Sequence, residues 1–319
     1  LDLVRTNFGC DPSEITIEVN PNDIEYKNIC GFLDMGINRV SIGTQSFQDS
    51  ILKTLGRTHS ADTAIACYEK LRKMEVDNIS LDLMYGIPYQ TLEDWKNSLH
   101  IVSELDPDHL SLYCLSLEKH TPMQRMIDFG ELELADDDLA ADMYMLAEEF
   151  LNEKGYEQYE ISNWSKPNKE SKHNLSYWMN RPFLGVGPGA HSYLFKNRFN
   201  NIKSPSTYIS KYLASKSFSI DSEHFESDLD LLRQIPSVEN IEPIDKDLEM
   251  GETMMLGLRL NRGIKEMEFE NRFGISVVDV FGETLKDLTE HKLVKYFDGV
   301  YRLTQKGRLL GNEVFSRFF

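Results

Sequence analysis

The chain has 319 residues, 41% of them hydrophobic and 11% aromatic, which suits a folded protein with one large and one smaller domain. Its formal net charge of −18 argues against a nucleic-acid partner, because phosphate binding requires clustered Lys and Arg. No apolar run approaches the roughly 20 residues of a membrane span. Four scattered cysteines, without a secretory signal, indicate free thiols in the cytoplasm: Cys10, Cys30, Cys67 and Cys114.

The first residues are predicted to be helical. Leu1, Leu3, Val4 and Phe8 have helical spacing, and Gly9 stands where a C-cap belongs. The first residue is not Met, so we expect the sequence to begin inside a helix of a longer protein.

From residue 14 onward, strand and helix patterns alternate. Strands are predicted at 15–20, 38–43, 78–84, 109–115 and 156–162, and helices at 22–36, 51–55, 61–74 and 137–155. Thr91 and Asp94 form a capping-box pattern that starts a further helix reaching Leu105. This alternation predicts βαβ units and a parallel sheet, either open or barrel-like.

Polar residues gather at the C-terminal ends of these strands: Glu18, Asn20, Ser41, Gln45, Asp82, Tyr113 and Ser116. Any one of them alone is more simply interpreted as a solvent-facing residue at a strand end. Four strands with the same layout favour a binding site, because the corresponding end of a βα barrel carries the active site. A Glu or Asp in such a position commonly accepts hydrogen bonds from ribose hydroxyls.

The last third is predicted to form a separate module. An acidic connector at 221–249 precedes three short helices, a hairpin with a type I′ turn at Asp298-Gly299, and a last helix from about Gln305 to Phe319. This order is winged-helix-like. The candidate recognition helix carries mostly carboxylates, which would repel phosphate, so we interpret the module as a cap or packing domain.

The segment KHNLSYWMNRPFLGVGPGAHSY, at 172–193, follows a hydrophilic stretch that we expect to be mobile. Its glycines alternate and do not match the dinucleotide fingerprint, so they indicate a turn with a close backbone approach. We expect His191 to be a packed loop residue. For His173, the residues alone favour a structural imidazole, with haem ligation beside Tyr177 and Trp178 as the alternative.

Several strings resemble one family. EITIEVNP, RVSIGTQSF, LGRTH, ISLDLMYGIP and HLSLYCL are similar to the oxygen-independent coproporphyrinogen III oxidase superfamily of radical S-adenosylmethionine (radical SAM) proteins. YEISNW, HNLSYW and LGVGPGAHSY resemble its HemW-like haem-chaperone branch. The resemblance covers essentially the whole chain. It implies an α/β fold, a partial radical-SAM (β/α) barrel lacking its first strands, followed by a small winged-helix-like domain.

The resemblance also implies domains and sites. The partial barrel with the HNxxYW segment would span 1–220, the connector 221–249, and a HemN-type C-terminal domain 250–319. Residues implied to bind S-adenosylmethionine are Glu18 and Asp82 at the ribose, Gln45 lining the site, and Arg57 at the methionine carboxylate. Residues implied to bind haem are His173, Asn174, Tyr177 and Trp178, with His173 as the iron ligand.

One departure from the family concerns its iron–sulfur cluster. Members carry CxxxCxxC, whose thiolates hold a [4Fe–4S] cluster, and a Gly-Gly-Gly-Thr-Pro segment that contacts S-adenosylmethionine. Neither motif occurs in these 319 residues. We expect both to lie upstream, and we expect the chain as given not to bind the cluster.

Three functions remain open at this stage. The leading one is a haem chaperone that hands haem to a recipient haem protein, membrane-associated recipients included, with S-adenosylmethionine and the cluster in support. The first alternative is an enzyme that oxidatively decarboxylates coproporphyrinogen III. The second is an inactive fragment. HNLSYW together with YEISNW favours the chaperone.

Overall fold

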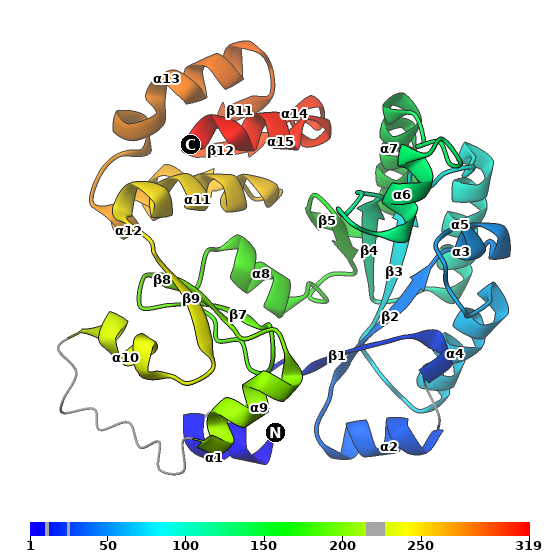
Figure 1. Ribbon diagram of the computed structural model, residues 1–319. Helices are drawn as coiled ribbons and strands as arrows, with labels where there is room; N and C mark the ends of the chain where they lie inside the picture. Colours follow the sequence, from blue (N-terminus) through cyan, green and yellow to red (C-terminus); the bar gives the residue numbers. More distant parts are fainter. Residues whose placement is uncertain (10–12, 24–25, 215–226) are drawn as a thin grey trace. The chain divides into compact units, whose positions relative to one another are not determined.

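The computed structural model describes residues 1–9, 13–23, 26–214 and 227–319 (Figure 1). Cys10, residues 24–25 of the predicted second helix and 221–226 of the predicted connector therefore lie outside the described residues. The chain divides into two compact units, Leu1–His173 and Asn174–Phe319. Within the described part, no helix has the length and apolar character that crossing a membrane requires.

The first unit is built on a six-stranded sheet of order β1-β2-β3-β4-β6-β5. The first four strands in chain order run parallel, as predicted, and β6 pairs antiparallel with β4 and with β5. The strands are β1 (Thr16–Val19), β2 (Arg39–Gln45), β3 (Ile79–Tyr85), β4 (His109–Cys114), β5 (Glu157–Glu160) and β6 (Asn163–Ser165).

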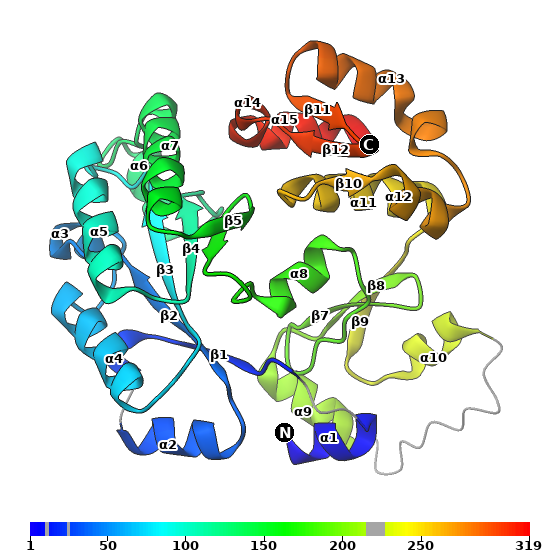
Figure 2. The same cartoon turned by 180° about the vertical axis from the view of Figure 1, so that it is seen from behind.

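Helices cover one face of this sheet, as Figures 1 and 2 show for α4, α5 and α7. Apolar residues of β2, β3 and β4 pack there against Leu71 of α4, Trp95 and Leu99 of α5, and Met143 of α7. The helices of the unit are α1 (Asp2–Phe8), η1 (Pro21–Asp23), α2 (Tyr26–Asp34), α3 (Asp49–Thr54), α4 (Ala61–Lys73), α5 (Leu92–Leu105), α6 (Pro122–Asp128) and α7 (Asp137–Glu153).

The predicted helix ends are confirmed where local chemistry fixes them. Thr91 Oγ1 accepts from Asp94 N at 3.1 Å and the Asp94 carboxylate accepts from Thr91 N at 2.9 Å, which is the capping box. Gly9 ends α1 with φ of 58°, a left-handed conformation that glycine adopts without a steric penalty.

The string YEISNW forms the β5–β6 turn. The Glu160 side chain is fully buried and accepts hydrogen bonds from Ser162 N, at 3.0 Å, and from Asn163 Nδ2. Two donors therefore hold this buried carboxylate. The short strand β6 was not predicted, because three residues are too few to show an alternating pattern.

The second unit contains two three-stranded sheets, of orders β7-β8-β9 and β10-β12-β11. Its strands are β7 (His191–Leu194), β8 (Asn197–Asn201), β9 (Val238–Pro243), β10 (Ile264–Lys265), β11 (Val294–Phe297) and β12 (Val300–Leu303). Its helices are α8 (Lys172–Trp178, which begins in the first unit), α9 (Pro205–Ala214), α10 (Asp228–Gln234), α11 (Lys246–Arg259), α12 (Glu266–Phe273), α13 (Val277–Glu290), α14 (Gln305–Leu309), α15 (Gly311–Phe315) and η3 (Ser316–Phe318).

The C-terminal module follows the predicted order with one correction. Asp298 and Gly299 both have positive φ, 50° and 73°, as a type I′ turn requires. The single last helix was wrong: α14 ends before Leu310, whose φ of −103° and ψ of 31° leave the helical region. Gly311 follows at the break, and glycine is a weak helix former.

The region predicted as a connector, 221–249, contains regular structure where it is described. It holds α10, β9 and the start of α11, and β9 pairs with β8 from Asn197↔Pro243 to Asn201↔Val238. The boundaries at 220 and 249 remain predictions.

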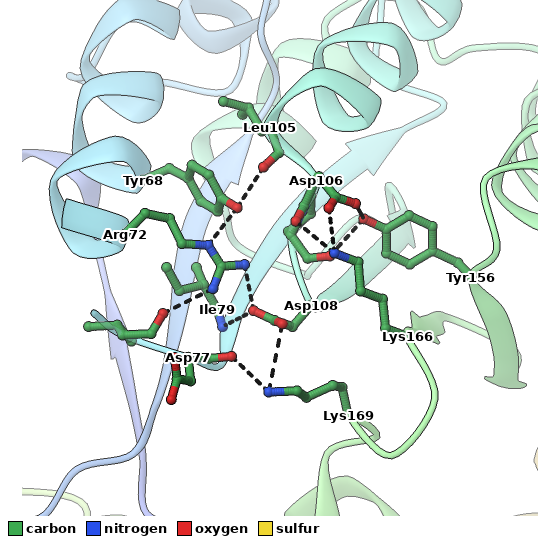
Figure 3. A network of polar contacts seen from close by, with 12 residues as sticks. Tyr68, Arg72, Asp77, Ile79, Leu105, Asp106, Asp108, Tyr156, Lys166 and Lys169 are labelled. Carbon is green, nitrogen blue, oxygen red and sulfur yellow. Dashed lines mark hydrogen bonds and ion pairs between the residues drawn. The ribbon is translucent and has the colours of Figure 1, made fainter. Parts of the chain in front are cut away.

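A polar network joins the N-terminal ends of β3 and β4 in the first unit; we call it the Asp108 clamp (Figure 3). Asp108 pairs with Arg72 of α4 at 2.6 Å and accepts from Ile79 N, the first residue of β3, at 3.0 Å. Arg72 also donates to Tyr68 Oη at 2.8 Å and to Val76 O at 2.9 Å. One carboxylate thus connects a helix to the starts of two adjacent strands.

Two lysines from the stretch before α8 complete the clamp. Lys169 Nζ donates to Asp77 O at 2.8 Å and lies 3.7 Å from Asp108. Lys166 pairs with Asp106 at 2.7 Å. The hydrophilic stretch is thus connected, through its lysines, to carboxylates that lie far from it in the sequence, and its mobility remains a prediction.

Candidate functional site

One face of the large sheet carries polar side chains. Side chains alternate along a strand, and register partners in adjacent strands point to the same side. The partners Glu18↔Ser41, Ser41↔Ser80 and Asp82↔Ser111 therefore share this face, opposite the apolar residues that pack on the helices. Glu18 of β1 and Asp82 of β3 are thus brought to one surface, as predicted, although Asp82 lies in the middle of its strand rather than at the C-terminal end.

Asp82 lies at the centre of this polar face. Ser41 Oγ lies within hydrogen-bonding distance of both of its carboxylate oxygens, at 3.0 and 3.2 Å. Burial raises the pKa of the Asp82 carboxyl above its usual value, against the lowering effects of hydrogen bonds from Ser111 and Ser41 and of the Arg39 charge. The nearby Glu18 carboxylate adds to the rise. Asp82 is therefore a hydrogen-bond acceptor whose ionised form is destabilised by burial.

Gln45 stands at the end of β2, beyond an irregularity in the pairing with β3. Its φ of 64° is left-handed, a conformation that non-glycine residues rarely adopt outside functional sites and turns. Its amide lies close to the backbone of Gly43, where a Cβ would come within 3.3 Å of Gln45 Nε2. The predicted site residue is therefore held at the strand end by unusual backbone geometry.

Arg57 is exposed, in the loop after α3. None of the described contacts joins it to Glu18, Gln45 or Asp82. In the same LGRTH string, His59 is buried, and its Nε2 lies 3.0 Å from Thr44 O. His59 is therefore a structural residue. His59 thus holds this loop against the end of β2 and leaves the guanidinium of Arg57 in solvent.

The hydrogen-bonding groups of this polar face can be compared with the chemical groups of the implied cofactors. Glu18, Asp82 and Gln45 offer carboxylate and amide oxygens on one polar surface, which suits the hydroxyls of a ribose. Among the described residues, no group of three or more His, Cys, Asp and Glu could hold a metal ion, and the three described cysteines are free. These residues fit the nucleoside part of S-adenosylmethionine and do not fit a [4Fe–4S] cluster.

A second polar chain runs beside Asp82 and was missed from the sequence. His109 is fully buried, with Nδ1 2.8 Å from Ser80 Oγ and Nε2 2.8 Å from Tyr159 Oη. Ser80 Oγ lies 3.4 Å from Asp82. Since a carboxylate only accepts, the consistent arrangement has Ser80 donating to Asp82, His109 Nδ1–H donating to Ser80, and Tyr159 donating to Nε2. The imidazole is therefore neutral.

His109 makes the stability of the first unit pH-dependent. Burial, with the Arg39 charge, lowers its pKa well below the usual value, so the unfolded state binds a proton that the folded state does not. The stabilisation is present above about pH 6.5 and is lost as the pH falls, by up to about 1.4 kcal/mol per pH unit. We expect His109→Gln to flatten this slope in urea unfolding between pH 5 and 6.5. His100→Gln, an exposed control, should retain it; equal slopes for all three proteins would contradict this assignment.

The four residues implied for haem lie on α8, but on two faces of it. His173 and Tyr177 are four residues apart and share one face, and Asn174 and Trp178 share another. His173 is exposed, whereas Tyr177 packs edge-on against Phe183 with ring centroids 4.6 Å apart. The helix thus presents an imidazole with one aromatic ring a turn away, and Trp178 is directed elsewhere.

The glycine-rich turn after α8 contains the close backbone approach that was predicted. A Cβ on Gly185 would come within 2.2 Å of His191 O, so only glycine fits there. The expectation for His191 was wrong: it is the exposed first residue of β7, and alternation along that strand turns its side chain to the face opposite the buried Ser192.

Comparisons with known proteins agree with this architecture. Residues 7–102 match the radical SAM superfamily, and residues 244–310 match the HemN C-terminal domain. The heme chaperone HemW of Bacillus subtilis is 36% identical over 97% of this chain and 76% of the relative. The heme chaperone HemW of Lactococcus lactis is 35% identical over 96% of this chain and 75% of the relative. The chain belongs to the HemW family of the radical SAM superfamily.

A solved structure supports the fold independently. HemN from Escherichia coli, a coproporphyrinogen III oxidase and radical SAM enzyme, has a TM-score of 0.75 against this structure at 23% sequence identity. The match covers 96% of this chain and 69% of that chain. It establishes a radical-SAM α/β fold followed by a HemN-type C-terminal domain, as the resemblance implied.

Proposed function

We propose that the protein is a haem-binding chaperone that delivers haem to a recipient haem protein. The supporting observation is α8, which presents the exposed His173 with Tyr177 one turn later on the same face. An imidazole nitrogen is a usual axial ligand of haem iron, and an aromatic ring suits the face of a porphyrin. The names of the HemW relatives support the same function.

The polar face of the first unit is proposed to bind S-adenosylmethionine. Glu18 and Asp82 would accept hydrogen bonds from its ribose, Gln45 would line the site, and Arg57 would meet the methionine carboxylate as a planar two-pronged donor. The family implies a [4Fe–4S] cluster as well, but no described residues fit it, and no step is assigned to it.

Recipients and location are part of the same proposal. Haem is the ligand, the recipient is a haem protein, and membrane-associated recipients are included. Free thiols at Cys30, Cys67 and Cys114 support a reducing compartment, and we propose that this compartment is the cytoplasm.

A second candidate function rests on the likeness of fold to HemN. The same architecture in an oxidase would decarboxylate coproporphyrinogen III. Anaerobic incubation of coproporphyrinogen with a full-length protein that includes the expected upstream cluster-binding segment, followed by chromatography of the porphyrins, separates the two functions. Turnover would favour the enzyme over the chaperone.

The chaperone proposal is tested at His173. In His173→Ala we expect the Soret band of bound haem to shift and the affinity to fall several-fold, because the iron–nitrogen bond is lost while the ring contact with Tyr177 remains. His191→Ala removes another exposed imidazole and should leave the spectrum unchanged. Circular dichroism verifies that both variants fold. A folded His173→Ala protein with the original spectrum and affinity would refute His173 as the ligand.

A further inference from the structure

A cavity of about 260 Å³ lies within the second unit, beside the C-terminal end of α8. It is formed by residues of α8, α11, β10 and α12 and by the short turn between α11 and β10. Its volume is below the roughly 300–1,000 Å³ of pockets that enclose drug-sized ligands. It can therefore receive one edge of a large planar molecule but not the whole of it.

The cavity combines apolar walls with cationic side chains. Trp178 and Phe269 are among its apolar lining residues. Its charged lining residues are three cations, Arg181 (just after α8), Arg262 and Arg272, and one carboxylate, Glu268. Such an accumulation of arginine is unusual in a chain with a net charge of −18. The combination suits a ligand that carries an anionic group on an apolar, flat framework.

The three arginine side chains differ in how many hydrogen bonds and ion pairs they make with described residues. Arg272 is held by Glu249 at 2.7 Å and by two main-chain carbonyls, Asn180 O at 3.0 Å and Met179 O at 3.2 Å. Arg262 has a single, longer ion pair with Glu268, at 3.5 Å. The exposed side chain of Arg181 makes no hydrogen bond or ion pair with any described residue.

Trp178 adds a rigidly held aromatic ring to the wall of the cavity. The Arg259 guanidinium covers its indole ring at 4.3 Å from the centroid, which fixes the ring by a cation–π contact. Its Nε1–H is buried and has no hydrogen-bond partner among the described residues. Trp178 therefore offers the cavity a fixed apolar ring rather than a hydrogen-bond donor.

We propose that this cavity holds a propionate-bearing edge of the porphyrin, an inference that rests on the proposed function. Arg181 and Arg262 bind the carboxylate, and Trp178 and Phe269 contact the adjoining ring carbons. A guanidinium matches a carboxylate with two parallel hydrogen bonds, which a hydrated lysine would not reproduce. Trp178 is then assigned to the propionate edge of the porphyrin rather than to its iron.

Iron-free protoporphyrin IX tests the cavity without iron coordination. We expect Arg181→Gln to weaken its binding about tenfold, as measured by quenching of tryptophan fluorescence. The dimethyl ester of protoporphyrin IX has no carboxylate, so wild type and Arg181→Gln should bind it equally. Arg317→Gln removes an exposed arginine of the same unit outside the cavity and should bind both porphyrins like wild type. Arg181→Lys should recover only part of the loss.

The results of these experiments test the cavity assignment separately from the chaperone proposal. His173→Ala should leave the affinity for iron-free protoporphyrin IX unchanged, since there is no iron to ligate. If Arg181→Gln binds the free acid as tightly as wild type while His173→Ala still alters the haem spectrum, the cavity assignment is wrong and the chaperone proposal stands. If wild type binds neither haem nor protoporphyrin IX, both are wrong.

Discussion

Replacing Asp82 with asparagine, in a version of the protein that includes the expected upstream segment, is expected to reduce the affinity for S-adenosylmethionine about tenfold. The carboxylate lies on the polar face next to Glu18 and accepts from Ser41, so it is placed to accept from a ribose hydroxyl as well. A hydrogen bond to a charged group contributes about 1.5–3 kcal/mol and one to a neutral amide about 0.5–1.5 kcal/mol, so the difference corresponds to about tenfold in affinity. Isothermal calorimetry measures it, with the exposed Glu104→Gln as control.

The same substitution should act in the opposite direction on stability. Because burial raises the pKa of Asp82, the stability it contributes is present below its unfolded pKa of about 3.8 and is lost as the pH rises through the folded pKa. Asparagine has no charge to bury and can still accept from Ser41. Urea unfolding should therefore show Asp82→Asn gaining stability relative to wild type between pH 4 and pH 7. Unchanged affinity together with no relative gain would mean that the site is misplaced.

Replacing Asp108 with asparagine is expected to lower the free energy of unfolding of the first unit by about 2–3 kcal/mol. The side chain of Asp108 is 10% exposed, and the substitution removes the charged partner of Arg72 and weakens the bond to Ile79 N. Breaking a buried pair on one side leaves the remaining charge without compensation.

Asp106→Asn is the matched control for this prediction. Asp106 pairs with Lys166 at 2.7 Å but is 65% exposed, and exposed pairs contribute about 0–1 kcal/mol. Asparagine also tolerates the left-handed φ of 52° at this position. Urea midpoints of the two variants should differ clearly. Equal losses would show that the depth of burial of the carboxylate does not decide the strength of the clamp.

Much of the first unit could be predicted from sequence because its signals are local. Thr91 and Asp94 lie three residues apart and satisfy each other, so the start of α5 could be predicted from the spacing alone. Glu18 and Asp82 could be placed on one surface because they lie on parallel strands of the same sheet, although the sequence placed Asp82 at the end of β3 rather than in its middle. The turn at Asp298-Gly299 could likewise be predicted, because its signal is two adjacent residues.

The features that were missed depend on register or on distant partners. Nothing in the sequence near His109 shows that Ser80 and Tyr159 meet its ring, because those contacts follow from strand pairing. Lys166 and Lys169 look like ordinary solvated residues until their carboxylate partners are known. The reversed strand β6 is too short to carry a periodic signal.

The distribution of tryptophan gives each unit its own optical reporter. The chain has three tryptophans, of which Trp95 and Trp164 are fully buried in the core of the first unit. Trp178 belongs to the second unit and is covered by a guanidinium. Emission from a Trp178→Phe protein would therefore come from the first unit alone, and the difference from wild type would follow the second. Melting of the two units can thus be followed separately, without an added label, by comparing these two proteins.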